Sequence, residues 1–481
     1  MNWISEHAFL LLLVAGYTAL MLKHALDGRR ATRGMTDFYV GGRSMGGFAL
    51  GVSFFATYSS TNSFVGFSGQ AYAYGAPWLL LAPCAVLFSL LAWIWIAPKL
   101  RSYTGEVGAV TIPEFMGRRY RSGGAQVSAA LIVIFASFLY MVAVFKGIGN
   151  LLQTFLDVPY VVAIGIVFGI VVLYTAFGGF ISVVKTDVVQ GLVMLAAAFF
   201  LFIGTTRAAG GLGTIRELQR SVKPELFQWD AAMPFLVLIG IIVAGTMKFM
   251  VEPRQLSRFF ALEDERARRS GMVVSTLLFL VVYSLLVPIG LYAHAVIAGP
   301  IDDTDLIVPT LIADTGVFHP AIGAVLLVAM IAAAMSSLDS VLLVLASSFE
   351  RDIIQRWAPT DSDQRTVART RVYVAVFALI TAILALRPVG GIVTLTAFSG
   401  SLYAACFFPA LVLGLHSARG RGPSALASFA VGLGILLVWP LSPLGASIHQ
   451  VFPALLLSTV VFWIVAQFDD RHAPLPIDSR Q

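Results

Sequence analysis

The sequence predicts an all-helical protein embedded in a membrane, and three observations lead to this class. Of its 481 residues, 58% are hydrophobic and only 12% are charged, which is too few charges to cover the surface of a soluble domain. The apolar residues gather in long runs, and about 20 apolar residues suffice for a helix to cross roughly 30 Å of hydrocarbon. Only short loops separate these runs. We therefore expect a single integral membrane domain over residues 1–481.

Thirteen apolar runs, taken in chain order, are each read as a spanning helix. The first, Ala8 to Leu22, has no Lys or Arg before it and no small-residue cleavage site after it, so we expect a retained helix and not a signal peptide. Only the turn at Gly178-Gly179 separates the fifth span from the sixth. The expected spans are 7–22, 46–71, 76–97, 126–156, 160–177, 182–206, 231–250, 271–298, 320–349, 371–387, 390–415, 424–440 and 449–467.

The distribution of Lys and Arg predicts the orientation, because short cytoplasmic loops of membrane proteins are enriched in these residues. With the amino terminus outside, the inside loops hold most of the basic side chains, whereas the outside loop 299–319 has four Asp and no Lys or Arg. An odd number of spans then places the tail 468–481 in the cytoplasm of a cell with a bacterial-type inner membrane. The inside clusters are Lys23, Arg29, Arg30, Arg33 and Arg43; Lys99, Arg101, Arg118, Arg119 and Arg121; Arg254, Arg258, Arg266, Arg268 and Arg269; and Arg351, Arg356, Arg365, Arg369 and Arg371.

Several classes of function are disfavoured by composition and motifs. The net charge of +6 comes from short clusters between apolar runs and not from one basic stripe, so we expect no nucleic-acid partner. The two cysteines, Cys84 and Cys406, both lie in apolar runs and make neither a disulfide framework nor a zinc site. The sequence has no G-x-S-x-G elbow, no H-E-x-x-H pair and no P-loop. We therefore expect neither an enzyme nor a bound cofactor.

Two spans contain polar or helix-breaking stretches at corresponding places. The second span holds Phe55 to Ser63, a run rich in Ser and Thr, and the seventh leads through Ala244 to Lys248 into Glu252-Pro253. Carriers are often built from two inverted repeats whose first helices are broken at the middle of the bilayer. The alternative is that the Ser and Thr side chains only bond back to carbonyls or hold helices together.

The ninth span carries the most informative segment. Helical spacing places Ser336, Asp339 and Ser340 on one face, with Ser337 beside it. A carboxylate at a helix centre costs about 2.5–3.5 kcal/mol on the insertion scale, so it should face a cavity, a cation or a partner. Hydroxyls and unwound-helix carbonyls could bind a hard cation such as sodium. The alternative is an Asp339 that forms a salt bridge with Lys146 or Lys248.

Four segments spread over most of the chain resemble consecutive signatures of the sodium/solute symporter family, and they occur in the family's order. This family includes proline, pantothenate, sialic acid, glucose and monocarboxylate carriers. The segments are Gly41-Gly42-Arg43-Ser44-Met45-Gly46, YTAFGGFISVVKTDVVQG (174–191), EPRQLSRFFALEDERARRSG (252–271) and AAAMSSLDSVLLVLASSFERDI (332–353).

The resemblance implies a leucine-transporter-like fold of five-plus-five inverted repeats with about 13 transmembrane helices. On this chain the leading helix is 7–22, the first repeat 46–206, the second repeat 231–415 and the trailing helices 424–467. The implied function is sodium-coupled symport of a small organic solute by alternating access. A symporter-like sensor domain acting with a separate signalling partner is the alternative from another class.

The resemblance also implies two cation sites. Carried over by motif, the principal sodium ligands are backbone carbonyls of Ala56, Ser59 and Ala333 and the hydroxyls of Ser336 and Ser337. A second site of some members maps to Asp187, Ser336, Asp339 and Ser340. Asp339 stands where related carriers more often have Ser, so the occupant of this second site, sodium or a proton, is left open. Neutralisation of Asp187 by Lys185 is the competing explanation.

Solute-contacting positions of the family lie at the two breaks and on neighbouring helices. Positions that carry Glu and Ser in sugar carriers are Ala82 and Ala85 here, which leaves a sugar few hydrogen-bond partners. Dipole ends of broken helices and a nearby Lys favour a carboxylate instead. We therefore expect a monocarboxylate or an amino acid, although packing alone could explain the aromatic residues. The candidate positions are Thr57, Tyr58, Asn62, Ser63, Tyr140, Lys248 and Phe249.

Overall fold

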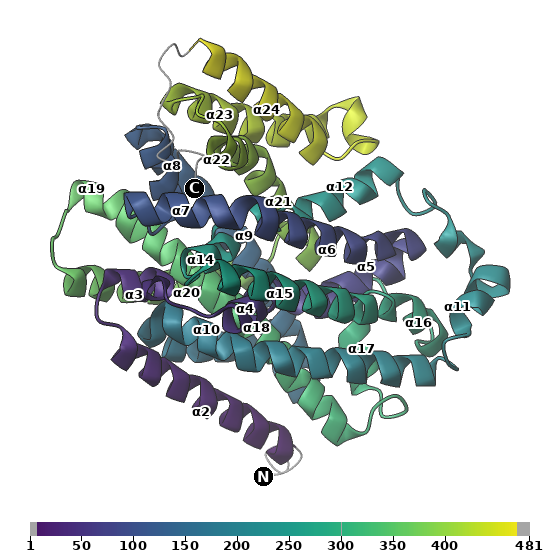
Figure 1. Ribbon diagram of the computed structural model, residues 1–481. Coiled ribbons are helices and arrows are strands. Elements are labelled where there is room, and N and C mark those ends of the chain that lie inside the picture. Colours follow the sequence, from purple (N-terminus) through teal and green to yellow (C-terminus); the bar gives the residue numbers. More distant parts are fainter. Residues whose placement is uncertain (1–6, 300, 469–481) are drawn as a thin grey trace.

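A computed structural model describes residues 7–299 and 301–468, and in these residues the chain is built from helices without a β-sheet. Figure 1 shows the long helices running side by side across the molecule, with α4 and α18 near the centre. Ten helical stretches in this part of the chain are long and apolar enough to cross a membrane, and shorter apolar helices accompany them. Each expected span coincides with helix, while the total of thirteen crossings stays a prediction.

The first half of the chain contains the first predicted break. Helix α4 ends at Tyr58, Ser59 is extended, and the chain becomes helical again from Asn62. The elements are α2 (Ala8–Ala31), α3 (Met35–Val40), α4 (Gly47–Tyr58), η2 (Asn62–Gly66), α5 (Phe67–Tyr74), η3 (Ala76–Leu80), α6 (Leu81–Leu91), η4 (Ala92–Ile96), α7 (Ala97–Val107), α8 (Ile112–Arg119), α9 (Gly123–Leu156), α10 (Tyr160–Ala208) and α11 (Thr214–Glu217).

The second half contains the second break and the largely buried helix α18, which packs against α2, α4, α9, α10 and α20. Its elements are α12 (Phe235–Thr246), α13 (Lys248–Val251), α14 (Pro253–Phe260), α15 (Glu265–Leu286), α16 (Ile289–Val296), η7 (Thr304–Leu306), α17 (Ile307–Ala313), α18 (Pro320–Ser348), η8 (Phe349–Ile354), α19 (Gln355–Trp357), α20 (Asp363–Ala385), α21 (Ile392–Phe407), η9 (Phe408–Leu413), α22 (Gly414–His416), α23 (Gly422–Val438) and α24 (Val451–Gln467).

The seventh expected span ended too early. Glu252 is extended, as the residue before a proline tends to be, and Pro253 begins a new helix that continues the apolar segment to Phe260. Arg254 and Arg258, which the sequence pattern assigned to an inside loop, are therefore 2% and 1% exposed. Both guanidinium groups lie inside the protein, where they need partners.

Helix α10 joins the fifth and sixth expected spans through one kink. At Gly179 the backbone has φ 65° and ψ −173°, a conformation that essentially only glycine adopts. A Cβ atom at this position would lie 2.7 Å from the ring of Phe38, so the close approach of α3 also requires glycine. The kink directs the second half of α10, which includes Asp187, past α4 and α18.

The helices end in loops on two opposite faces. One face, which we call the basic face, carries α3, α8 and α19, and the far face carries α11, α16 and α17 (Figure 1). On the far face, Lys146 of α9 forms an ion pair with the buried Asp305, at 2.8 Å, and this carboxylate also accepts the backbone N–H of Ile392. The predicted inside tail, 468–481, lies outside the described residues beyond Phe468.

Candidate functional site

The break in α4 frees backbone carbonyls that face α18. A helix leaves its last four carbonyls without intrahelical partners, and here hydroxyls of α18 serve them. Ser336 Oγ lies 2.9 Å from the carbonyl oxygen of Ala56 and 3.0 Å from that of Ala333. Ser337 Oγ lies 3.5 Å from the carbonyl oxygen of Ser59. The structure thus brings the five predicted sodium ligands into one buried group of oxygens.

Thr57 also belongs to this group, although the sequence pattern assigned it to the solute. Its carbonyl oxygen lies 2.9 Å from Ser337 Oγ, which is closer than the carbonyl of Ser59. Its hydroxyl points away from the break, 3.1 Å from Ser340 Oγ and 3.2 Å from Asp187 Oδ2. Thr57 therefore links the principal oxygen group to the predicted second one.

The second predicted set of ligands surrounds a buried arginine. Asp187 Oδ2 accepts hydrogen bonds from Ser53 Oγ at 2.5 Å and from Arg258 Nη2 at 2.8 Å. The same guanidinium donates to Ser340 Oγ at 2.7 Å. Asp339 is fully buried, and its Oδ2 has no hydrogen-bond partner in the described part of the chain. The carboxylates of Asp187 and Asp339 are therefore accompanied by a cation that belongs to the protein.

The simple structural alternatives for the two aspartates are wrong. Lys146 pairs with Asp305 on the far face, and Lys248 makes no ion pair with any carboxylate of the described residues. Neither lysine therefore neutralises Asp339. Lys185 is exposed, and the cation paired with Asp187 is Arg258. Arg258 was not considered as a partner because the sequence pattern placed it in a loop.

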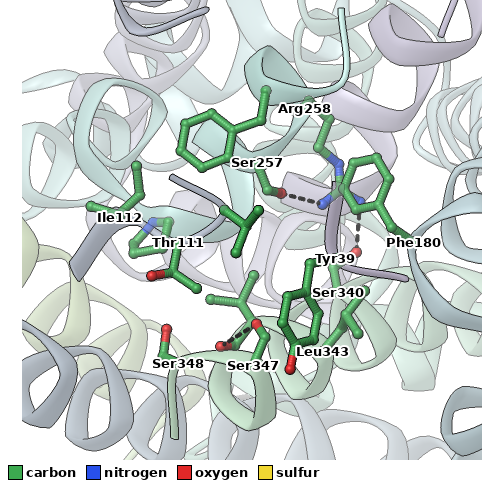
Figure 2. A pocket seen from close by; sticks show the side chains of 14 residues that line it. Tyr39, Thr111, Ile112, Phe180, Ser257, Arg258, Ser340, Leu343, Ser347 and Ser348 are labelled. Atoms are coloured by element: carbon green, nitrogen blue, oxygen red, sulfur yellow. Dashed lines mark hydrogen bonds between the residues drawn. The ribbon is translucent and has the colours of Figure 1, made fainter. Parts of the chain in front are cut away.

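A narrow cavity of about 20 Å³, which is room for about one water molecule, lies on the basic side of this arginine. Figure 2 shows Arg258 and Ser340 at one end of it and Thr111, Ser347 and Ser348 toward the other. The aromatic rings of Tyr39 and Phe180 form part of its wall. Arg258 and Ser340 thus line this cavity and also belong to the polar cluster around Asp187.

The predicted solute residues Tyr140 and Lys248 lie together. Lys248 is 2% exposed, and its ammonium sits 4.5 Å from the centre of the Tyr140 ring. The guanidinium of Arg254 lies 3.9 Å from the same ring and pairs with Glu252 at 2.7 Å. Because Glu252 is bound to Arg254, the ammonium of Lys248 is left with an aromatic ring as its neighbour.

The remaining solute candidates form an aromatic wall beside the break. Tyr58 stacks on Phe249 with ring centres 4.1 Å apart, and its hydroxyl donates to the carbonyl of Gly245. Ser63 Oγ lies 3.0 Å from the hydroxyl of Tyr283, while the side-chain oxygen of buried Asn62 has no hydrogen-bond partner in the described residues. Ala82 and Ala85 are buried on α6.

The chain matches the family model described as the sodium:solute symporter family over residues 38–432. The chain belongs to the sodium:solute symporter family. A family member, the osmoregulated proline transporter OpuE of Bacillus subtilis, is 30% identical to it over 459 residues, covering 92% of each chain. The sodium/pantothenate symporter of Haemophilus influenzae is 29% identical over 455 residues, covering 91% of each chain.

Solved structures support the same fold. A sodium-coupled sialic acid symporter, solved in a substrate-bound outward-open state, aligns over 96% of each chain with a TM-score of 0.82 and 19% identity. The nucleobase-cation symporter Mhp1 aligns with a TM-score of 0.57 over 93% of this chain. These neighbours are leucine-transporter-like carriers, so this symporter is a multi-pass membrane protein of that fold.

Four functional candidates of this symporter were missed from the sequence. Tyr283 contacts Ser63, while Glu252, Arg254 and Arg258 belong to a segment that was read as a helix end followed by an inside loop. A signal was available in Glu252-Pro253, because a proline inside an apolar segment can begin a second helix as well as end the first. Reading 253–260 as helix would have placed both arginines in the membrane domain.

Proposed function

We propose that this symporter imports a small organic solute that bears a carboxylate, a monocarboxylate or an amino acid, together with sodium. The observation that carries the solute class is the buried ammonium of Lys248. Among the described residues no carboxylate lies within salt-bridge distance of it. A lone buried charge is costly, and a carboxylate from the solute would complete the pair.

Known relatives support this class of solute. The curated relatives with the same length and about 30% identity include symporters of proline and of pantothenate, both of which carry a carboxylate. The stacked rings of Tyr58 and Phe249 offer an apolar surface next to Lys248 for the rest of the solute. Tyr140, Asn62 and Ser63 are further candidates for solute contact.

For sodium we propose the oxygen group between the end of α4 and α18. It consists of the carbonyls of Ala56, Ser59 and Ala333 and the hydroxyls of Ser336 and Ser337. Ser336 Oγ lies within 3.0 Å of the first and third carbonyls, and Ser337 Oγ lies 3.5 Å from the carbonyl of Ser59. A hard monovalent cation prefers such neutral oxygen ligands. The carbonyl of Thr57 would add a further oxygen.

Transport would follow alternating access between two inverted repeats, 46–206 and 231–415. The two interrupted segments, α4 to α5 and α12 to α14, would be the corresponding first helices of these repeats. We propose that the basic face is cytoplasmic and that the amino terminus lies outside the inner membrane. Arg266, Arg268 and Arg269 near the start of α15 still support this orientation without the two buried arginines.

The test is sodium-gradient-driven uptake by proteoliposomes of the full chain, screened with labelled amino acids, short-chain monocarboxylates, pantothenate and hexoses. The best carboxylate should lose its uptake when its methyl ester is offered instead. Lys248→Met should reduce carboxylate uptake at least tenfold, since about 1.4 kcal/mol corresponds to a factor of ten. Lys185→Met removes an exposed ammonium and is the matched control. If the protein took up a hexose and none of the carboxylates offered, the proposal would be refuted.

A further inference from the structure

The second predicted cation position already contains a positive charge, the guanidinium of Arg258. We infer that Arg258 fills this position permanently, so that the carrier binds one sodium ion, at Ser336 and Ser337, and not a second one at Asp187. This inference rests on the proposed sodium site and concerns how many sodium ions the chain can hold.

The hydrogen bonds show which oxygens the guanidinium uses. Nη2 donates to Asp187 Oδ2 and to Ser340 Oγ, and Nε donates to Ser53 Oγ at 3.1 Å. Nη1 donates to the carbonyl of Arg254 at 2.9 Å and to Ser257 Oγ at 3.2 Å. A guanidinium has five N–H groups, and those nearest Asp187 use Asp187 Oδ2, Ser340 Oγ and Ser53 Oγ. Asp187 Oδ1 and Asp339 Oδ2 have no hydrogen-bond partner among the described residues, but an ion bound to them would lie beside the guanidinium charge.

The balance of charge also favours a single sodium ion. Asp187, Asp339 and Arg258 are all buried, and with both carboxyls ionised they would carry one net negative charge. Glu252 and Arg254 cancel each other, and the ammonium of Lys248 beside Tyr140 is left for the solute carboxylate of the proposed function. One sodium at the neighbouring principal site would balance the group. A second would leave an excess positive charge in a low-dielectric interior, which is unfavourable.

The two positions are close enough for this balance to matter. Thr57 contributes its carbonyl to the principal oxygen group and its hydroxyl to the group around Arg258. The cavity on the basic side reaches Arg258 and Ser340 directly (Figure 2). A second cation that approached from this side would therefore meet the positive charge of the guanidinium.

The experiment measures the number of sodium ions bound by the purified full-length protein, with radioactive sodium as the probe and no solute present. The wild type should bind one sodium per chain, and Ser336→Ala/Ser337→Ala should abolish this binding. Asp187→Asn should still bind one. Arg258→Met should bind two, because the oxygens of Asp187, Ser340 and Ser53 become available, while Arg258→Lys should bind one.

The outcomes separate the inference from the proposed function. If the wild type binds two sodium ions and Asp187→Asn binds one, the inference is wrong while sodium coupling stands. If the wild type binds no sodium, the proposed function itself fails. Should Arg258→Met not fold, as judged by its elution and thermal midpoint in detergent, the comparison of wild type with Asp187→Asn still decides the question.

Discussion

Ser336 and Ser337 are the residues through which we expect sodium to act on transport. A hydrogen bond or ligand contact to a charged group contributes about 1.5–3 kcal/mol, so loss of one hydroxyl should weaken apparent sodium affinity roughly tenfold to a hundredfold. The measurement is the sodium concentration that gives half-maximal solute uptake in Ser336→Ala and Ser337→Ala.

A matched control for these serines exists on α23. Ser428 is also fully buried, but its hydroxyl donates only to the carbonyl of Ala425 in its own helix. Ser428→Ala should therefore leave the sodium dependence unchanged. A double Ser336→Ala/Ser337→Ala variant with wild-type sodium dependence would remove the site assignment.

At the scale of single elements, the far face depends on one ion pair between α9 and the segment η7–α17. Asp305 is 3% exposed, and removing one partner of such a buried pair costs about 3–5 kcal/mol. Lys146→Met should therefore loosen residues 304–313. Hydrogen exchange of their backbone amides should become faster than in the wild type.

Asp303 provides the control for this ion pair. It lies 3.6 Å from the same Lys146 ammonium, but it is 45% exposed, and exposed pairs contribute little. Asp303→Asn should leave exchange in 304–313 nearly unchanged. Equal exchange in Lys146→Met and the wild type would show that other contacts hold this segment in place.

At the scale of the whole molecule, Glu114 of α8 ties together distant segments on the basic face. Burial alone would raise the pKa of this carboxyl, but hydrogen bonds from Arg351, the Val110 N–H and Arg118 outweigh it and hold the pKa below its ordinary value. An ionised Glu114 therefore stabilises the folded chain above the ordinary carboxyl pKa. This contribution is lost as the pH falls through the lowered pKa.

Glu114→Gln should consequently lower the thermal midpoint of the purified protein at pH 7, by an amount corresponding to about 2 kcal/mol for lost charged hydrogen bonds. The difference from the wild type should shrink as the pH is lowered toward 4 and below. Glu106→Gln, on the exposed surface of α7, should change little at any pH. A difference that stays constant across this pH range would contradict the stated role of the carboxylate.

Much of the fold and the meeting of the segments proposed to bind sodium could be predicted from the sequence, because apolar runs and family motifs are local patterns. Apolar runs fix the spanning helices, and the paired serines at 336 and 337 together with the polar stretch at 55–63 mark two segments that do meet. The partners of Asp187 and Lys146 could not be predicted in this way. These partners depend on where helices far apart in the sequence cross. The helix that begins at Pro253 was not predicted, and it brings Arg258 into contact with Asp187 and with Ser53 of α4.

The carbonyl of Thr57 has a consequence for the energetics of the transport cycle. It receives the hydroxyl of Ser337 on one side and the guanidinium of Arg254 on the other, and Arg254 in turn lies against Tyr140 beside Lys248. This oxygen atom would thus interact with the proposed sodium site directly and with the proposed solute site through Arg254. Binding linkage is reciprocal: whatever factor sodium contributes to solute affinity, the solute must return to sodium affinity. The carbonyl of Thr57 is the atom through which we expect sodium binding and solute binding to affect each other.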